Sequence, residues 1–468
     1  MRPARAAALA LLTLAACSGD VATSPTASPG TTGPLPATSS EPDPTSTSDT
    51  PSSSDPSTSD TPTSDPSAST TDATTGIAET TGADTTCAMV GSPFLKWSSA
   101  GELPGLVTAA TATPTGDSVV VGRTLATENA QDAFLSVHSP DGDLRWTATY
   151  AGAHGLADGA IDVAVDAAGF VHVLVVETVS MTVVEEETIA DRRLVILRHA
   201  PDGASLWRWE QAYPPQDPAM SHDVDGTLEV VGDTIVLVSG TGTAPRIRTV
   251  LDRFGDVLAV TSIAVPKEVE LAKIWVSAIG SDGSVYVSGE FFAGQGEPTP
   301  WIGRFDGDGS LAWTATFGMA NDRAEALLVV ANGGIVTLWV REANPGEDQR
   351  WIRRHEPDGD VAWTWQFPFG AQLAGGLACD GTGLFGGGVE KPAGPQLQWD
   401  QRMDLGVWGL NTGGVPRWGQ EHEFGPPYSY GAATVVAGAP DGDVIVAGSY
   451  IGDDGASHQP WLGRYSFE

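Results

Sequence analysis

The sequence contains the phrase Ile352-Arg-Arg-His-Glu-Pro-Asp-Gly-Asp-Val-Ala-Trp363-Thr-Trp365, which reads as a strand, a tight turn and a second strand carrying Trp. Asp-Gly between two alternating strands is a strong hairpin signal, because the turn needs a positive φ that Gly adopts at little cost. Three clear copies of the phrase recur along the chain: SVHSPDGDLRW at 136–146, ILRHAPDGASLW at 196–207 and IGRFDGDGSLAW at 302–313. Two more copies are degenerate: LNTGGVPRW at 410–418 and, with less similarity, DRFGDVL at 252–258. A repeated strand–turn–strand unit predicts a repeat architecture.

The spacing of the repeated phrase predicts the fold. Its anchor positions lie 49 to 61 residues apart, a period that suits a four-stranded propeller blade: Trp97, Trp146, Trp207, Leu258, Trp313, Trp363 and Trp418. The last repeat stops where its Trp strand should begin, whereas Phe94–Ser99 is a Trp strand with nothing before it. We therefore predict an all-β, seven-bladed β-propeller of four-stranded blades, closed by the N-terminal strand in the last blade.

The first residues predict export. Arg2 and Arg5 precede a short apolar run, Ala6–Leu14, which is too short for a membrane-spanning helix and is typical of a secretion signal. The following Leu14-Ala15-Ala16-Cys17 resembles a bacterial lipobox, and this resemblance implies cleavage before Cys17 and a diacylglycerol, with palmitate-type acyl chains, on its thiol. Ser18 then implies the outer membrane of a diderm bacterium, on either its periplasmic or its cell-surface side. The alternative is an ordinary signal peptide with an incidental Cys.

Composition divides the chain into three parts. Residues 1–16 form the predicted lipoprotein signal peptide, and residues 17–86 the lipidated Cys and a disordered tether rich in Ser, Thr, Pro and Asp. The tether has no aromatic residue, so it cannot bury enough surface to offset the entropy of ordering. Residues 87–468 carry all 15 Trp and form the predicted propeller.

Two cysteines remain after Cys17. In an exported chain, Cys87 and Cys379 could form a disulfide or stay separate thiols, and the sequence leaves both readings open.

Charge and motifs exclude several classes of function. The net charge of −35 argues against nucleic acid and anionic membrane surfaces as partners. His138, His199 and His355 share one repeat position, which indicates a structural role, and the Asp-Gly pairs sit where hairpin turns are required. The chain has no catalytic elbow, phosphate-binding loop or His pair at metal spacing. We therefore predict no catalytic residues, no metal site and no cofactor.

Two resemblances accompany this reading. Asp162–Val175 and 277–289 resemble the bacterial cell-surface β-propeller repeats of the SBBP type, and the Asp-Gly…Trp phrase resembles quinoprotein-like (PQQ-like) propeller repeats. Quinone-dependent members of that fold have adjacent cysteines, which this chain lacks. Ser139-Pro140-Asp141-Gly142 places Gly one residue too early for a sialidase Asp box. The resemblances imply the propeller architecture and no particular activity.

The longest loops predict where a partner binds. They share one face of the expected propeller, because second-to-third-strand loops and blade-to-blade loops lie on the same side, and we call this side the long-loop face. We expect ligand-binding residues there: Glu185, Glu186, Glu187, Phe291, Phe292, Trp399, Asp453 and Asp454. The predicted protein is an outer-membrane-anchored, non-catalytic binding or scaffold module, monomeric, with a protein or carbohydrate partner. The alternative is an extracytoplasmic hydrolase or lyase using loop carboxylates near the central channel.

Overall fold

The computed structural model describes most of the predicted propeller. It describes residues 93–100, 105–124, 131–184, 187–213, 224–241, 246–263, 271–292, 298–316, 322–330, 333–341, 349–366, 371–372, 377–379, 384–390, 404–410, 414–422, 431–451 and 458–467. All of them belong to one structural unit, Ala78–Glu468. Their regular elements are β-strands, and none of these residues forms a helix long and apolar enough to cross a membrane.

Six antiparallel sheets have four strands each. The first blade is β2 (Gly105–Ala112), β3 (Ser118–Thr124), β4 (Ala133–His138) and β5 (Leu144–Tyr150). The second is β6 (Gly159–Val165), β7 (Val171–Val184), β8 (Glu187–His199) and β9 (Ser205–Ala212). The third is β10 (Val224–Val231), β11 (Thr234–Thr241), β12 (Arg246–Asp252) and β13 (Val257–Ile263).

The other three four-stranded blades lie further along the chain. The fourth is β14 (Leu271–Ile279), β15 (Val285–Phe292), β16 (Pro298–Phe305) and β17 (Leu311–Thr316). The fifth is β18 (Asp322–Val329), β19 (Ile335–Arg341), β20 (Gln349–His355) and β21 (Val361–Gln366). The last blade is β27 (Gly431–Gly438), β28 (Val444–Ile451), β29 (His458–Phe467) and β1 (Pro93–Ala100).

The prediction of seven four-stranded blades was wrong in its count, because six sheets have that form. The remaining sheet has five strands: β22 (Ala371–Gln372), β23 (Leu377–Cys379), β24 (Leu384–Glu390), β25 (Asp404–Leu410) and β26 (Pro416–His422). Both β22 and β23 pair with β24, so two short strands stand where the other sheets have one. The sequence between them contains Gly375-Gly376, and glycine weakens a strand because it has no side chain to pack.

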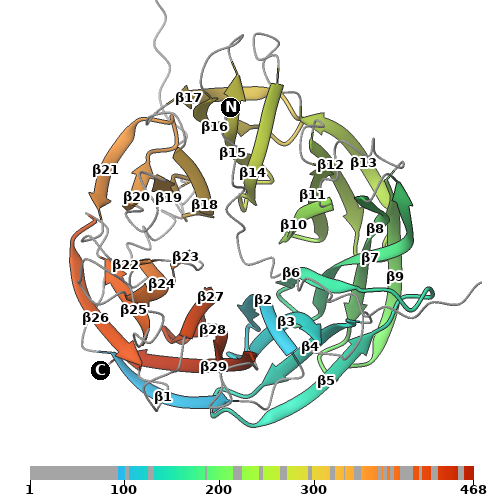
Figure 1. Ribbon diagram of the computed structural model, residues 1–468, viewed down its shortest axis with the longest axis horizontal. Helices are drawn as coiled ribbons and strands as arrows, with labels where there is room; N and C mark the ends of the chain where they lie inside the picture. The colour runs from blue at the N-terminus through green and yellow to red at the C-terminus, as the bar shows by residue number, and fades with distance from the viewer. Residues whose placement is uncertain are drawn as a thin grey trace, which may run out of the picture. The chain divides into compact units, whose positions relative to one another are not determined.

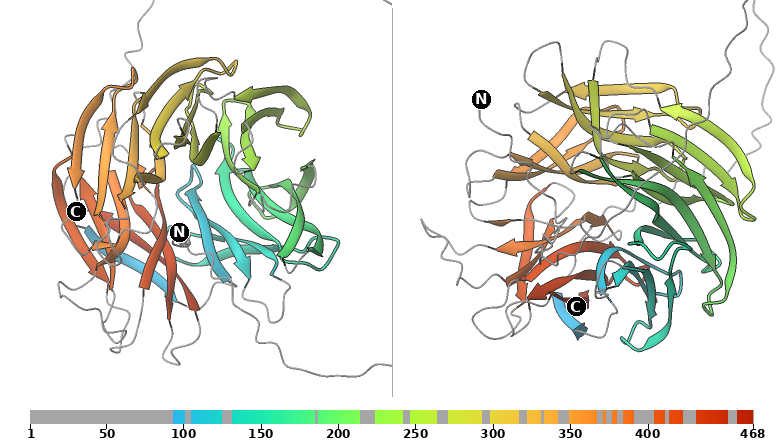
Figure 2. Two further views of the ribbon diagram at one scale, coloured as in Figure 1. Left: turned by 45° about the horizontal axis from the view of Figure 1, so that its top comes forward. Right: turned by 45° about the vertical axis from the view of Figure 1, so that its right-hand side comes forward.

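The described sheets form a β-propeller. The innermost strands make contact in the order β2, β6, β10, β14, β18, β23 and β27, and β27 contacts β2. Figure 1 shows the sheets side by side around a common centre, and Figure 2 shows them from two oblique directions. Apolar cores lie between neighbouring sheets; the one between the first and second blades contains Val121, Leu135, Val173 and Val195.

The N-terminal strand closes the last blade, as the sequence predicted. β1 pairs with β29 along its whole length, from Pro93 opposite Phe467 to Ala100 opposite Trp461. The order of strands in this sheet is therefore β1-β29-β28-β27, and the chain's first described strand is its outermost one. This pairing covers the edge of β29 that would otherwise be open to another strand.

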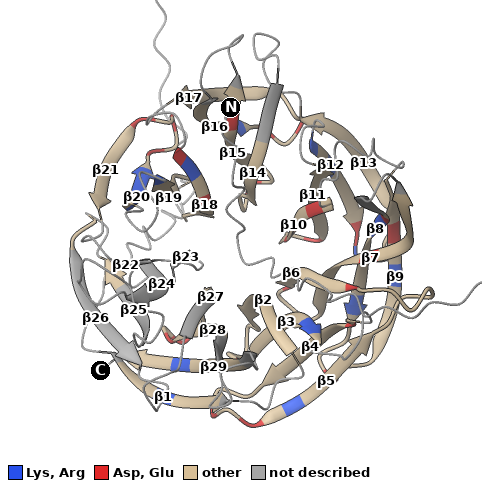
Figure 3. Cartoon of the chain, viewed as in Figure 1, with Lys and Arg blue, Asp and Glu red and all other residues tan. Residues whose placement is uncertain are grey.

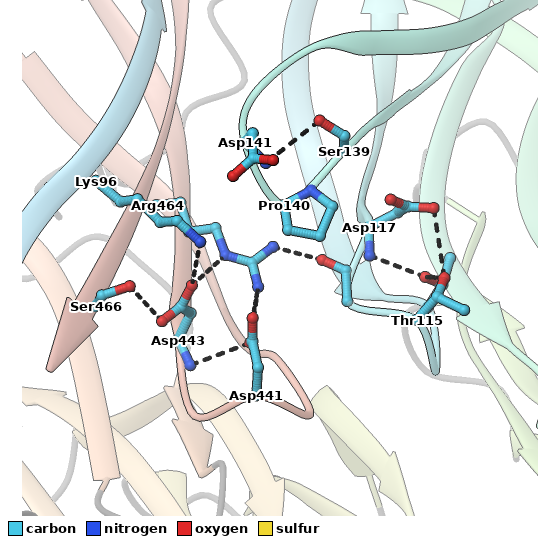
Figure 4. Close-up of polar contacts among 12 residues, drawn as sticks. Lys96, Thr115, Asp117, Ser139, Pro140, Asp141, Asp441, Asp443, Arg464 and Ser466 are labelled. Atoms are coloured by element: carbon cyan, nitrogen blue, oxygen red, sulfur yellow. Dashed lines mark hydrogen bonds and ion pairs between the residues drawn. The ribbon is translucent and has the colours of Figure 1, made fainter.

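A buried guanidinium joins the last blade to the first. Arg464 on β29 has no exposed side-chain surface, and its Nε donates to Asp443 at 2.6 Å. Its two terminal nitrogens donate to Asp441 at 2.5 Å and to the carbonyl oxygen of Gly116 in the first blade (Figure 4). Lys96 on β1 lies 3.7 Å from Asp443, so the same cluster also includes the closing strand.

The Asp-Gly pairs form tight turns, as predicted. In the second blade the N–H of Ala200 donates to Ala204 at 2.8 Å, and the N–H of Gly203 donates to Ala200 at 2.9 Å. Gly203 has a φ of 90°, and the pairing of β8 with β9 shifts between Arg198 and His199. This is a turn closed by a left-handed glycine next to a β-bulge, a common three-residue hairpin.

A Trp on the outermost strand of one blade contacts the turn of the next blade. Trp146 Nε1 donates to the carbonyl of Pro201 at 2.9 Å, and a Cβ on Gly203 would lie 2.8 Å from the indole. The same hydrogen bond joins Trp97 to Pro140, Trp207 to Arg253 and Trp313 to Pro357. We call this arrangement the Trp–turn contact. These four Trp residues therefore lie between neighbouring blades.

Two features of the turns refine the repeat. His199 stacks on Trp146 with ring centres 5.9 Å apart, and its Nδ1 lies 3.3 Å from the Gly203 carbonyl, which supports the structural role expected for this position. In the third blade the anchor assignment to Leu258 was wrong by one residue. Ala259 pairs with Val250 as Trp207 pairs with Arg198, and Leu258 is exposed.

Candidate functional site

Several residues expected on the long-loop face lie outside the described residues: Glu185, Glu186, Trp399, Asp453 and Asp454. The predicted lipid-attachment residue Cys17 and the possible disulfide partner Cys87 also lie outside them. Glu187 begins β8, where its backbone pairs with Val184. Phe292 is the last residue of β15, and Cys379 is the last residue of β23. The structure therefore leaves the proposed disulfide and most of the proposed loop set as predictions.

Phe291 differs from the expectation of an exposed loop side chain. It lies in β15, opposite Ala272 and Thr299, and is half-buried against the apolar core around Val285 and Val287. Alternate residues of a strand share a face, so Phe291 continues the buried face that these two valines begin. Its replacement would change folding as well as any binding.

The chain on both sides of Glu185 and Glu186, which we expected to belong to a long loop, is strand. β7 and β8 pair with each other from Val171–His199 to Val184–Glu187. β6 reaches only Val176 of β7, and β9 reaches only Arg193 of β8, so a two-stranded ribbon extends beyond the blade. The β-branched residues of Thr178–Val184 favour a strand, and this was the signal in the sequence.

A cluster of polar side chains lies where this ribbon leaves the blade. Glu177 on β7 is fully buried, and its carboxylate accepts hydrogen bonds from Arg193 at 2.7 and 3.0 Å. It also accepts from the Tyr150 hydroxyl at 2.7 Å and from Arg208 at 2.9 Å. We call Tyr150, Glu177, Arg193 and Arg208 the Glu177 cluster, which joins the end of the first blade to three strands of the second. Sequence reasoning missed it because its four members come from four different strands in two blades.

Electrostatics fix the charges of this cluster. Burial raises the pKa of Glu177, but the hydrogen bonds from Arg193 and Tyr150 and the two guanidinium charges outweigh it, and the net effect is a lowered pKa. Burial and the bond to Glu177 raise the pKa of Tyr150, so its hydroxyl stays protonated. Glu177 is thus an ionised carboxylate surrounded by donors, which suits a fixed brace better than proton exchange.

A second carboxylate supports the same end of the blade. Asp158 precedes β6, and its two oxygens accept from the backbone N–H groups of Gly152 at 2.5 Å and Thr178 at 3.0 Å. The Thr178 hydroxyl donates to the carbonyl of Ala157 at 2.6 Å. These bonds attach the connection between the first and second blades to the base of the ribbon.

Arg–carboxylate pairs recur in other blades. In the fifth blade Arg341 donates to Asp322 at 2.6 and 2.8 Å, and Glu325 pairs with Arg323 at 3.3 Å and with Arg350. Figure 3 shows positions of both signs on β9 and β18 and basic positions on β20. Among the described residues, no group of three or more His, Cys, Asp and Glu side chains is placed to hold a metal ion.

One half-buried carboxyl has a pKa near neutrality. Burial raises the pKa of Asp162 on β6 to about 7, and nearby Glu229 adds to the shift. Such a group could exchange protons in a reaction. Its oxygens, however, accept from the backbone N–H of Val163 at 2.8 Å and of Leu228 in the third blade at 2.7 Å. The carboxyl therefore links the innermost strands of the second and third blades.

Comparisons with known proteins give matches to solved structures at low identity and low TM-score. No family model matches the chain, and no curated protein matches its sequence. A protein of unknown function from Bacteroides caccae is 13% identical, with 57% of this chain and 83% of that chain covered and a TM-score of 0.36. A protein of unknown function from Dyadobacter fermentans is 11% identical, with 80% and 99% covered and a TM-score of 0.41. A neuraminidase-like protein of a flat-faced bat isolate from Peru is 9% identical, with 65% and 86% covered and a TM-score of 0.37.

The Glu177 cluster predicts a pH-dependent stability. Replacing Glu177 by Gln should lower the free energy of unfolding by about 3–5 kcal/mol at neutral pH, because two Arg side chains lose a buried carboxylate. Since the folded pKa of Glu177 is lowered, its stabilisation is complete above the unfolded pKa of about 4.3 and is lost as the pH falls through the folded value. Urea unfolding of both proteins at neutral pH and in acid measures the difference.

Glu210→Gln is the matched control. Glu210 contacts the same Arg193 and Arg208, but 53% of its side chain is exposed, so the loss should be below about 1 kcal/mol. The proposed role of the Glu177 carboxylate would be contradicted if the two variants lost the same free energy of unfolding. It would also be contradicted if the loss for Glu177→Gln were the same at both pH values.

Proposed function

We propose that this protein is an exported, lipid-anchored propeller that binds a partner through its long-loop face without catalysing a reaction. The anchor is Cys17, in the outer membrane, and the low-complexity residues up to 86 hold the propeller away from the bilayer. The partner is a protein or a carbohydrate, and the propeller acts as a monomer. The signal-like N-terminus and the Ser/Thr/Pro-rich tether support this assignment.

The observation that carries the binding role is the β7–β8 ribbon. Met181 is 48% exposed and Val183 is 69% exposed, although both lie in a regular strand. The ribbon leaves the blade at the Glu177 cluster, which holds its base in place. An apolar strand that projects from a rigid scaffold presents both side chains and unpaired backbone groups to a partner.

The enzyme alternative has weaker support. It requires carboxylates whose oxygens can reach a substrate. Glu177 accepts four hydrogen bonds, and both oxygens of Asp162 accept backbone N–H groups. We therefore favour binding over hydrolase or lyase activity as the function of this face.

The anchor is tested by replacing Cys17 with Ser. The wild-type chain should be found in the outer-membrane fraction, and Cys17→Ser should be found in the soluble extracytoplasmic fraction, because the lipid supplies the attachment. Immunoblotting of separated fractions and metabolic labelling with a palmitate analogue measure both effects. An unlabelled wild-type protein, or a variant that stays in the membrane, would refute the anchor.

The binding role of the β7–β8 ribbon is tested by placing a charged residue at one of its exposed apolar positions. Val183→Asp should weaken binding of the cognate partner about tenfold or more without changing thermal stability, because it places a charge on the proposed contact surface. Val260→Asp is the control: Val260 is 64% exposed in β13, the outermost strand of the third blade. Quantitative cross-linking of whole cells identifies the partner, and titration of that partner measures both variants. Equal binding by the two variants would exclude the ribbon as the contact surface.

A further inference from the structure

A cleft of about 220 Å³ lies between the first and second blades. Apolar residues of β4, β5, β7 and β8 line it, among them Ala133, Leu135, Ala148, Val173, Val175 and Leu197. Tyr150 lines one end and His199 lines the other. The exposed residues Thr149 and Ser205 also line it, so the cleft reaches the surface of the molecule.

The cleft lies beside a small residue, Ala148. Ala148 pairs with Leu135, two positions beyond the Trp146–Val137 pair. The corresponding residue is Trp209 in the second blade, opposite Ile196, and Trp365 in the fifth blade, opposite Ile352. A methyl group thus occupies the place that an indole occupies at two other blade junctions.

The two Trp residues show what this kind of space accommodates. Trp209 packs against the core that contains Leu174, Ile235 and Leu237, between the second and third blades. Trp365 packs against Leu338 and Leu410 in the same manner. An indole therefore fits between neighbouring sheets of this fold, in contact with aliphatic side chains on both sides.

One polar atom at the end of the cleft can orient a ligand. The Nδ1 of His199 lies 3.3 Å from the Gly203 carbonyl, which accepts only, so Nδ1 carries the proton in this contact. Burial lowers the pKa of His199, so the ring is neutral and Nε2 is a hydrogen-bond acceptor. At the equivalent positions Nε2 of His138 and of His355 is buried, whereas His199 lines the cleft.

We propose that this cleft binds one uncharged bicyclic aromatic ring that carries a hydrogen-bond donor, such as indole. An apolar cavity of about 150 Å³ is known to hold benzene, so a cleft of about 220 Å³ has room for a larger ring system. The ring lies beside Ala148, and its N–H donates to Nε2 of His199. The site is separate from the β7–β8 ribbon, so its test does not depend on the proposed partner.

Calorimetric titration of the full chain with indole tests the site. The wild-type protein should bind one indole, and Ala148→Trp should weaken binding about tenfold or more, because its own indole fills the cleft. The control is Thr147→Trp, which adds the same ring to the outward face of the same strand and should bind indole as the wild type does. Ala148→Leu is the second filling variant and should also weaken binding, which covers a failure of Ala148→Trp to fold.

A change in the ligand, with the protein unchanged, provides an independent measurement. Indene has the shape of indole but lacks the N–H donor, so the wild-type protein should bind indole about threefold or more tightly than indene. Absence of saturable indole binding, equal binding by wild type and the folded filling variants, or equal affinity for indole and indene would overturn the proposal.

Discussion

The contact between a Trp and the glycine turn of the next blade is the interaction on which the propeller depends. It combines a hydrogen bond from the indole to a turn carbonyl with close packing of the ring on a residue that has no Cβ. The glycine meets two requirements at once, since Gly203 has a positive φ and a Cβ there would lie 2.8 Å from Trp146. This double requirement explains why Asp-Gly and Trp recur together in the repeats. The N-terminal strand belongs to the same system, because β1 supplies Trp97 to the turn at Pro140.

Variation around this fixed contact distinguishes the blades. Two residues after the contact Trp, the second and fifth blades place another Trp in the core, whereas the first blade places Ala148 and leaves a cleft. The charged pairs also differ from blade to blade. The Glu177 cluster joins the first blade to the second and fixes the base of the β7–β8 ribbon. The constant turns thus build the scaffold, and the candidate binding features lie where the repeats differ.

The sequence predicted the architecture because a hairpin phrase with a regular period depends on local chemistry. The four-stranded blades, the Asp-Gly turns and the pairing of β1 with β29 follow from that phrase and are confirmed. The count of four-stranded blades failed at β22 and β23, two short strands that both pair with β24. Leu258 was misassigned because the third blade has Ala259, and no Trp, at the anchor position. The Glu177 cluster could not be predicted, since Tyr150 of the first blade meets Glu177 only after two blades have packed together, and Arg208 reaches Glu177 from a strand that does not pair with β7.

The most direct test of the Trp–turn contact compares two glycines with similar backbones. Gly203 has a φ of 90° and would place a Cβ 2.8 Å from Trp146, whereas Gly169 has a φ of 85° and would place a Cβ 3.6 Å from Pro201. Ala at either position is strained, because its backbone must adopt a left-handed conformation. The free energies of unfolding of the two variants should therefore differ by about 1–3 kcal/mol, with Gly203→Ala the less stable, because only that variant crowds the Trp. Equal losses of stability in urea would contradict the account.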